Sequence, residues 1–433
     1  MNGRFLSQAE RVGATARISR VDVTPVAFAD PPLLNAVGVH EPFALRAIVR
    51  VHTDDGLVGL GETYADDAHL ERLNAVAAAL PGVDAFETSR LLWLVRDVLG
   101  RSGSAGGDGV AAMINGASTV DRVFSPFEVA CLDLAGRMTG RPVVDLLGGR
   151  VRDVVPYSAY LFYKWAEHPG ADADEWGEAL TPEQLVEQAR HMIDRWGFTA
   201  IKLKGGVLPP DEEIETIHGL AAEFPGVPLR LDPNAAWTVE TGIRVAKALE
   251  GLVEYLEDPS PGIRGMARVA AEAPMPLATN MAVVAFDQLP PAIAADAVQV
   301  VLSDHHFWGG MRRSQLLAGT CETFGLGLSM HSNSHLGISL AAMTHLAAAT
   351  PNLTYACDTH WPWKTEDVVR PGALTFADGA VAVPDGPGLG VELDEDALGT
   401  LHEQYLASGL HSRDDTGYMR RFRPDFERRL GSW

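Results

Sequence analysis

The chain has 433 residues, more than one ordinary domain needs, so its length favours a large α/β domain with a smaller one beside it. Hydrophobic residues make up 46% and charged residues 21% of the chain, values typical of folded globular proteins rather than of disordered or fibrous ones. The formal net charge of −22 argues against nucleic acid and anionic membranes as partners, because both would repel a net anion.

The number of cysteines and the lengths of the apolar runs indicate in which cellular compartment the protein works. Cys131, Cys321 and Cys357 are too few and too scattered for a disulfide framework or a zinc site. The first twenty residues lack the apolar core of a secretory signal, and no stretch approaches the roughly 18 apolar residues of a membrane helix. We therefore expect a cytoplasmic protein without membrane contact.

The first 150 residues predict an α+β domain. Residues 17–65 contain the β-rich runs SRVDVTPVAFA, LRAIVRVHT and LVGLGET, and the turn DDG between the last two predicts a hairpin. Residues 67–147 have helical spacing, with a helix that should stop near the turn at Gly140, Arg141 and Pro142. Strands followed by segregated helices are typical of an α+β domain, here over residues 1–150.

After Arg152 the chain alternates short β-rich runs with helical segments, about 25 residues apart. The runs are FTAIKLK, VPLRLDP, LVEYLED, MPLATN, AVQVVLSD, GLGLSMHS and LTYACDT. With an earlier run at residues 155–162 they make eight strands, which predicts a (β/α)8-type barrel over residues 151–395. A doubly wound sheet is the competing fold, but no G-x-G-x-x-G follows its first strand. Residues 396–433 should pack back on the barrel and the first domain.

A polar or ionisable residue stands at the end of each of these runs. The markers are Lys204, Asp232, Glu257, Asn280, Asp304, His331 and His360. In a barrel the C-terminal ends of the strands meet at one mouth, so these side chains should converge there. A strand-end or helix-capping role explains one such residue, but three oxygen donors on successive strands favour a metal site. Asp232, Glu257 and Asn280 predict Mg²⁺ rather than zinc, because hard oxygen ligands suit Mg²⁺.

Candidate bases flank the predicted metal site. Lys202 and Lys204 have period-2 spacing in IKLKGG and so point to the same side of a strand. Two like charges held close, near a cation, lower each other's affinity for a proton, which a lysine base requires; a pair of solvated strand-end lysines is the alternative. Asp304 and His331 on later strands form a possible carboxylate–imidazole pair. A metal between two bases suggests proton abstraction next to a carboxylate, through an enediolate.

The motifs together resemble the enolase superfamily, and within it the glucarate dehydratase subgroup of the mandelate-racemase-like enzymes. The resemblance spans essentially the whole chain and is carried by NAVGVHEPF, IKLKGG, DPNAAW, EDP, ATNM, SDHHFWGG, MHSNSHLGIS, DTHWPW and SRDD. Asn in ATNM, followed by HSNSH, makes the ordered set specific. SDHHFWGG departs from the expected pattern Asp-x-His-Phe-Trp by carrying the additional histidine His305. The Gly-rich segment 102–117 has no assigned role.

The resemblance implies a role for each matching residue. Asp232, Glu257 and Asn280 would bind Mg²⁺, and Lys204 would be the base on one face, with Lys202 depressing its pKa. His331, paired with Asp304, would be the acid/base on the opposite face. Substrate contacts are implied for His40, Tyr160, Phe162, Asn234, Ser332, His360 and Arg413. The first domain would cap the barrel, and the loop with His40 would close over the mouth.

The implied function is a Mg²⁺-dependent hydro-lyase that dehydrates an aldaric acid, foremost D-glucarate and also L-idarate, to a keto-deoxy-glucarate. The alternatives are a dehydratase or epimerase of galactarate or of a monocarboxylic sugar acid, and a catalytically silent relative that only binds sugar acids. A homo-oligomer is expected. Mg²⁺, Lys202, Lys204 and Arg413 would supply the local positive charge that an acidic substrate needs in a chain of net charge −22.

Overall fold

The computed structural model of the chain describes residues 16–101 and 119–433. The Gly-rich segment 102–117 lies outside these ranges, as do the first fifteen residues of the stretch considered for a secretory signal. Within the two described ranges, no helix is long and apolar enough to cross a membrane.

An antiparallel sheet forms the centre of the N-terminal domain, in the order β1 (Ile18–Ala29), β4 (Phe43–Thr53) and β5 (Val58–Tyr64). The predicted hairpin joins β4 to β5, and Gly56 in its turn has a φ of 87°, which glycine adopts without steric cost. A second, two-residue pair, β2 (Leu34–Asn35) and β3 (Gly38–Val39), leads directly to His40.

Helices cover one face of this sheet. They are α1 (Asp67–Ala77), α2 (Thr88–Arg101) and α3 (Thr119–Thr139), and the short α4 (Val143–Leu146) after them packs between α3 and the barrel helix α12. α3 ends at the predicted turn, where Gly140 has a φ of 65°. α3 crosses β5 so closely that a Cβ on Gly59 would lie 2.0 Å from the Ala130 carbonyl oxygen, and one on Gly61 would lie 2.1 Å from that of Pro126. The glycines of LVGLGET therefore permit this helix–sheet contact.

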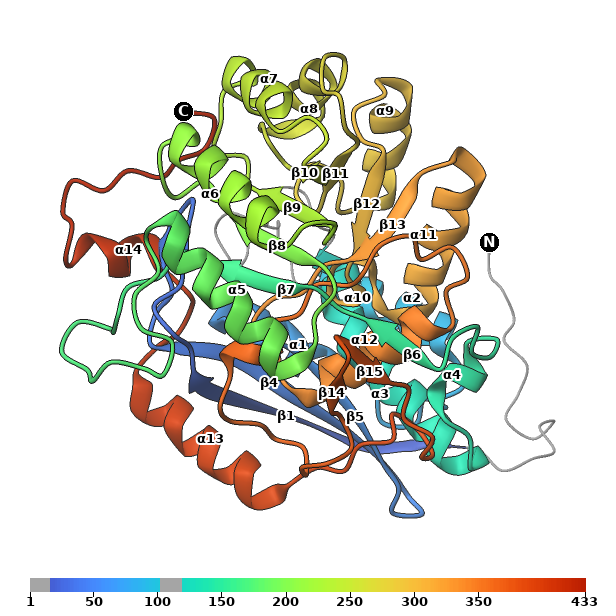
Figure 1. Ribbon diagram of the computed structural model, residues 1–433. Coiled ribbons are helices and arrows are strands. Elements are labelled where there is room, and N and C mark those ends of the chain that lie inside the picture. The colour runs from blue at the N-terminus through green and yellow to red at the C-terminus, as the bar shows by residue number, and fades with distance from the viewer. Residues whose placement is uncertain (1–15, 102–118) are drawn as a thin grey trace.

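The second part of the chain forms a parallel barrel, with the strand order β7-β8-β9-β10-β11-β12-β13. The strands are β7 (Ala159–Phe162), β8 (Ile201–Lys204), β9 (Leu229–Asp232), β10 (Val253–Glu257), β11 (Leu277–Thr279), β12 (Val300–Ser303) and β13 (Gly327–Met330). Figure 1 shows helices around the barrel and the N-terminal sheet lying below it. The predicted fold class, a (β/α)8-type barrel with an N-terminal α+β domain, is confirmed.

The eighth strand differs from the prediction. Instead of a ladder, LTYACDT forms one isolated parallel bridge between Cys357 and Tyr157. The amide of Cys357 donates to the Pro156 carbonyl (2.9 Å), and the amide of Asp358 donates to the Met330 carbonyl (2.8 Å) on the other side. The segment thus lies between the C-terminal end of β13 and the start of β7. It pairs with each of these neighbours over too few residues to form a strand.

Helices alternate with the barrel strands as the spacing predicts. They are α5 (Pro182–Trp196), α6 (Pro210–Glu223), α7 (Val239–Ala248), α8 (Gly262–Ala270), α9 (Leu289–Ala294), α10 (His305–Trp308), α11 (Gly310–Phe324) and α12 (Gly337–Ala348), with 3₁₀ turns η2 (Phe286–Gln288) and η3 (Trp361–Trp363). α5 shows how the sequence sets these boundaries. Thr181 and Gln184 form a capping box, Pro182 opens the helix, and Gly197 ends it with a φ of 72°.

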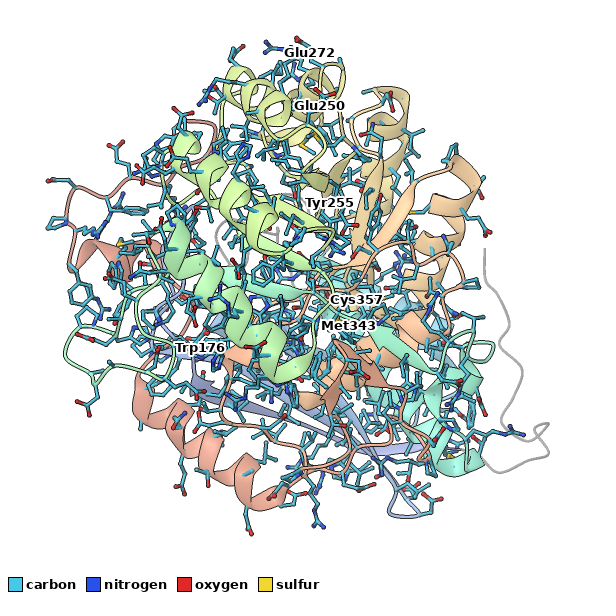
Figure 2. The ribbon with its side chains drawn as sticks, in the orientation of Figure 1. Trp176, Glu250, Tyr255, Glu272, Met343 and Cys357 are labelled. Atoms are coloured by element: carbon cyan, nitrogen blue, oxygen red, sulfur yellow. The ribbon has the colours of Figure 1, made fainter. Side chains whose placement is uncertain are left out.

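Side chains fill the lower part of the barrel. Tyr255, Ala278, Val300 and Leu302 make an apolar cluster on the strands. Figure 2 shows Tyr255 and Cys357 within the barrel, whereas Glu250 and Glu272 lie at its outer end. A small antiparallel sheet lies outside the barrel, in the order β14 (Phe376–Ala377), β15 (Ala380–Ala382) and β6 (Val154–Pro156).

The C-terminal segment contacts the N-terminal domain and the barrel. α13 (Glu395–Ser408) lies along β1 (Figure 1), where His402 bonds the Pro25 carbonyl (2.7 Å) and Gln404 donates to that of Ala27 (3.1 Å). α14 (Asp415–Arg420) follows, and the amide of Ser432 donates to the Ala236 carbonyl (2.9 Å) beyond β9. The last residues therefore reach the mouth of the barrel.

Candidate active site

The strand-end residues lie at one mouth of the barrel. Lys204, Asp232 and Glu257 are the last residues of β8, β9 and β10. Asn280, Asp304 and His331 each directly follow β11, β12 and β13, and His360 precedes η3. All seven are buried. Because neighbouring parallel strands are in register, Lys204 pairs with Asp232 along the β8–β9 ladder, and the ligand-type side chains come side by side.

Lys204 is held between two residues of the β9 end. Its Nζ donates to Asp232 Oδ2 (2.7 Å) and to Asn234 Oδ1 (2.8 Å). Asn234 adopts a left-handed φ of 55°, and its amide donates to Asp232 Oδ1 (3.0 Å), a turn that asparagine tolerates well. Tyr160 on β7 also donates to Asp232 Oδ2 (3.3 Å). The DPN sequence therefore forms a tight turn that brings Asn234 to the lysine.

Lys202 lies one step deeper, among carboxylates. Its Nζ is 2.7 Å from both Glu257 Oε2 and Asp358 Oδ2, and 3.4 Å from Asp232 Oδ2. It also lies 4.6 Å from the centre of the Tyr160 ring. Burial lowers the pKa of Lys202, but Asp358 and Glu257 outweigh it and hold that pKa well above its usual value. The lowering expected from two neighbouring lysines therefore does not describe Lys202, because carboxylates surround it.

Two of the three predicted metal ligands, Glu257 and Asn280, carry unsatisfied side-chain atoms, whereas both oxygens of Asp232 accept hydrogen bonds. Both carboxylate oxygens of Glu257 and both polar atoms of the Asn280 amide are buried and accept or donate no hydrogen bond, although Glu257 is ion-paired. Burial and the nearby Asp232 carboxylate raise the pKa of Glu257 well above its usual value. A buried polar group without a partner is costly unless something satisfies it. These residues fit a hard divalent cation, which would take up the free oxygens.

Asp258 fixes the Asn280 end of this set. It follows Glu257 with a left-handed φ of 39°, and its carboxylate accepts hydrogen bonds from the Thr279 hydroxyl (2.6 Å) and the backbone N–H of Asn280 (2.8 Å). The amides of Met281 and Ala282 donate to it as well. The EDP sequence therefore supplies one candidate ligand and the residue that orients the next one.

The histidine side of the mouth is built around Asp304. His331 Nδ1 bonds Asp304 Oδ2 (3.1 Å), as the sequence predicted for this pair. His306 Nδ1 and the His306 amide both bond Asp304 Oδ1, at 2.7 and 2.8 Å. Burial raises the pKa of Asp304, but His306 and His331 outweigh it and hold that pKa well below its usual range.

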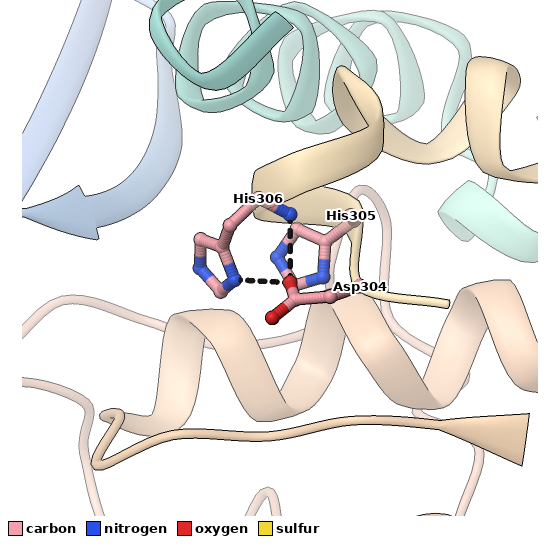
Figure 3. Close-up of side chains that lie close together, drawn as sticks. All are labelled: Asp304, His305 and His306. Atoms are coloured by element: carbon pink, nitrogen blue, oxygen red, sulfur yellow. Dashed lines mark hydrogen bonds and ion pairs between the residues drawn. The ribbon is translucent and has the colours of Figure 1, made fainter. Parts of the chain in front are cut away.

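Asp304, His305 and His306 offer ligand atoms within 4.8 Å of one another, a spacing that suits a metal ion (Figure 3). Both nitrogens of His306 are already engaged, however. Nδ1 bonds Asp304, and Nε2 lies 2.8 Å from Arg46 Nη2. A cation here would compete with a buried guanidinium. The oxygen set of Asp232, Glu257 and Asn280 is the better candidate metal site.

A cavity at the mouth joins the two sides. Its lining includes Lys204 and His331, and with them most of the predicted substrate contacts: His40, Tyr160, Phe162, Asn234, His360 and Arg413. Ser332, the remaining one, accepts from or donates to His360 Nδ1 at 3.0 Å. The two candidate bases therefore face one small space, as a site with a base on each face of a substrate requires.

The far end of this cavity comes from the N-terminal domain and the C-terminal segment. His40 Nδ1 bonds Asp30 Oδ2 (3.0 Å). Arg413 donates two bonds of 2.7 Å to the carboxylate of Asp415, which also accepts from Asn35 (2.8 Å). The buried Asp415 carboxylate fixes the plane of the guanidinium and helps to hold the pKa of Arg413 above its usual value.

Several residues of the site were not singled out from the sequence. They are Asn35, Asn333, Asp415, Asp358 and His306. Asp358 had a usable signal, since it lies two residues before His360 and period-2 spacing puts both on one side of an extended segment. Asn35 and Asp415 stand in the quoted motifs NAVGVHEPF and SRDD, but no spacing along the chain shows that α14 reaches the β2–β3 hairpin and brings the two together.

Comparisons with known proteins match both parts of the chain. Residues 19–148 match the model for the mandelate racemase / muconate lactonizing enzyme N-terminal domain, and residues 184–397 match that for an enolase C-terminal domain-like fold. A probable glucarate dehydratase of Streptomyces coelicolor is 52% identical, over 94% of this chain and 97% of that protein.

Solved structures agree with this relationship. An enolase from Mycobacterium smegmatis, complexed with formate and acetate, is 68% identical with a TM-score of 0.94, and covers 96% of this chain and 98% of its own. An enolase from Pseudomonas fluorescens with bound magnesium, potassium and tartrate is 50% identical with a TM-score of 0.93, and covers 97% of this chain and 100% of its own.

Proposed function

Since the chain belongs to the mandelate racemase / muconate lactonizing enzyme family within the enolase superfamily, we propose that it is a Mg²⁺-dependent dehydratase of aldaric acids that acts on D-glucarate and L-idarate. The chain is a hydro-lyase by its relationship to the S. coelicolor protein; the acid sugar and the metal are what we propose. The observation that carries the proposal is the cavity in which Lys204 and His331 lie with Arg413 at one end.

Asp232, Glu257 and Asn280 would hold Mg²⁺, which related enolases contain. Bound there, the cation would supply Lewis-acid stabilisation of the charge that grows on the substrate carboxylate. Lys202 lies among three carboxylates, two of which belong to these candidate ligands. This buried cation limits the repulsion among the carboxylates.

Lys204 and His331 would act on opposite faces of the substrate. Lys204 would take the α-proton from one epimer, and His331 would take it from the other, because they approach one cavity from β8 and β13. His331 Nδ1 faces Asp304, so its Nε2 is the nitrogen left for the substrate. The same ring would protonate the departing β-hydroxyl, which completes loss of water. Arg413 would bind the distal carboxylate through the guanidinium edge that Asp415 does not use.

The test is dehydration by the purified protein in Mg²⁺. D-glucarate, L-idarate, galactarate and a monocarboxylic sugar acid are each incubated with enzyme, and the keto-deoxy product is trapped with semicarbazide. We expect product from glucarate and idarate, and none from either with His331→Asn. Turnover of galactarate or the monoacid alone would replace the substrate assignment. Binding of all four without turnover would identify a silent relative.

The remaining proposals concern metal and assembly. Removal of Mg²⁺ by a chelator should abolish turnover, and adding Mg²⁺ back should restore it. A homo-oligomer stays a prediction; light scattering of the purified protein would test it. A monomer at assay concentration would contradict it.

A further inference from the structure

A chain of buried hydrogen bonds runs from the N-terminal domain to the histidine base. Arg46 on β4 approaches His306 (Nη2 to Nε2, 2.8 Å), and His306 bonds Asp304 (Nδ1 to Oδ1, 2.7 Å). Asp304 in turn bonds His331 (Oδ2 to Nδ1, 3.1 Å). All four side chains are at least nine-tenths buried, so water does not compete for these bonds.

The chemistry of Arg46 fixes the direction of the bonds that His306 makes. A guanidinium has only donors, so His306 Nε2 must accept from it. The Ser339 hydroxyl, 3.0 Å from the same nitrogen, can donate as well. With Nε2 accepting, the ring proton of His306 resides on Nδ1 and is donated to Asp304. Asp304 Oδ2 is then an acceptor for His331 Nδ1–H, and this leaves His331 Nε2 for the substrate.

The N-terminal domain holds Arg46 rigidly in place. Its Nε donates to Glu62 Oε1 on β5 (2.9 Å), and its guanidinium carbon lies 4.5 Å from the centre of the Tyr64 ring. Glu62 also accepts from the amides of Leu336 and Ser339 (both 2.8 Å), at the start of α12 beyond His331. The same strand pair thus contacts the segments that follow both β12 and β13.

We propose that Arg46 and His306 are positioning residues for the acid/base His331, and that the N-terminal domain sets the tautomer of that histidine through them. The inference rests on the proposed function and adds to it a role for the first domain besides covering the mouth. The contact between the N-terminal domain and the barrel is then linked to the tautomer of His331, because Arg46 belongs to the domain and Asp304 to the barrel.

Paired amide substitutions separate this role from simple packing. His306→Asn places an amide NH₂ near Nδ1 and keeps the donor to Asp304, whereas His306→Gln places its amide near Nε2 and loses that donor. We expect His306→Gln to lower kcat for glucarate about 10- to 100-fold with little change in KM. His306→Asn should lose only a few-fold. Arg46→Lys keeps the charge beside Glu62 but lacks the fork that also reaches His306, and should lower kcat about 10-fold.

The matched control is Arg313→Lys. Arg313 on α11 donates to Asp121 on α3 (3.0 Å), so it also joins the barrel to the N-terminal domain, but outside this chain of bonds. We expect kcat within two-fold of the unmodified protein. A loss as large as that of Arg46→Lys would mean that any loosening of the domain contact slows the enzyme, and would overturn the proposal.

A second measurement does not depend on turnover. In Mg²⁺-loaded protein labelled with ¹⁵N-histidine, His331, assigned by its absence in His331→Asn, should show a proton on Nδ1. The proton should be redistributed to Nε2 in His306→Gln and Arg46→Lys, and not in His306→Asn. An unchanged tautomer in all variants, or equal kcat losses in the two His306 variants, would overturn the proposal. A protein that dehydrates no acid sugar would instead overturn the proposed function and leave the tautomer test intact.

Discussion

The two sides of the mouth are built in different ways. On the lysine side, Lys202, Lys204, Asp232 and Glu257 bond one another across adjacent strands of the barrel. On the histidine side, Asp304 and His331 depend on His306 and, through it, on Arg46 of the N-terminal domain. This difference shows that neighbouring strands are enough to assemble a cluster of opposite charges. Orienting the His331 imidazole also takes side chains from outside the barrel strands.

Removing either base gives the largest expected effect. Lys204→Ala and His331→Asn should each lower dehydration by about 10³-fold, because each removes a group that moves a proton. The two should differ by epimer. Exchange of the α-proton in D₂O, followed by NMR with glucarate and idarate separately, should survive for one epimer in each variant. Loss of exchange for both epimers in both variants would show that the two sides do not act on opposite faces.

Breaking the carboxylate cluster should mainly cost stability. Asp358→Asn leaves Lys202 with fewer counter-charges in a site that excludes water, and should lower the free energy of unfolding by about 3 kcal/mol. Urea denaturation of the apo protein measures it. The control is Asp153→Asn, whose side chain is 89% exposed and only weakly paired, and which should change stability by less than about 0.5 kcal/mol. Equal stability of Asp358→Asn and the unmodified protein would contradict a lysine side held together by charge.

The distal end of the cavity should control which acid is bound. Arg413→Lys loses the planar pairing with Asp415 and should raise KM for a dicarboxylic acid sugar about ten-fold, with kcat little changed. KM for a monocarboxylic sugar acid, where it is turned over at all, should stay the same. A rise of KM for both kinds of acid would argue against a contact with the second carboxylate.

A smaller effect is expected in the pH dependence of stability. It compares one buried carboxyl group on each side of the mouth. Burial raises the pKa of Glu128 and of Glu213 from 4.5 to about 7. Glu128 on α3 accepts from the Met311 amide (2.9 Å) at the start of α11, whereas Glu213 on α6 accepts from the Val207 amide (2.8 Å) just after Lys204. Each folded carboxyl therefore binds its proton more tightly than the unfolded one.

The free energy of unfolding should accordingly fall as the pH rises from about 4.5 to about 7, because the folded state retains protons that the unfolded chain has lost. Glu128→Gln and Glu213→Gln should each make this fall shallower, visible as a change of about 4 °C in the Tm difference between pH 5 and pH 8. Thermal melts across this range measure it. If only one variant changes the pH dependence of the Tm, only that carboxyl group is buried enough in solution to have a raised pKa.

Much of the architecture was accessible from residue spacing. Alternating β-rich and helical runs predicted the barrel, and strand-end residues predicted the mouth, because the C-terminal ends of parallel strands coincide. The DDG hairpin and the end of α3 near Gly140 were local turn signals. The eighth strand was not predictable in its detail, since Cys357 meets its neighbours at one bridge only and the run looks like any other β-rich segment.

The sequence by itself determined which residue types stand at the strand ends, that Lys202 and Lys204 share a side, and that Asp232, Glu257 and Asn280 succeed one another, because these relations follow from short-range periodicity. Only the tertiary structure decided that Asp358 neutralises Lys202 and that Asn35 of the N-terminal domain bonds Asp415, the partner of Arg413. It also brought Arg46 to His306 across 260 residues of chain. Such contacts depend on how domains pack, and no spacing along the chain encodes them.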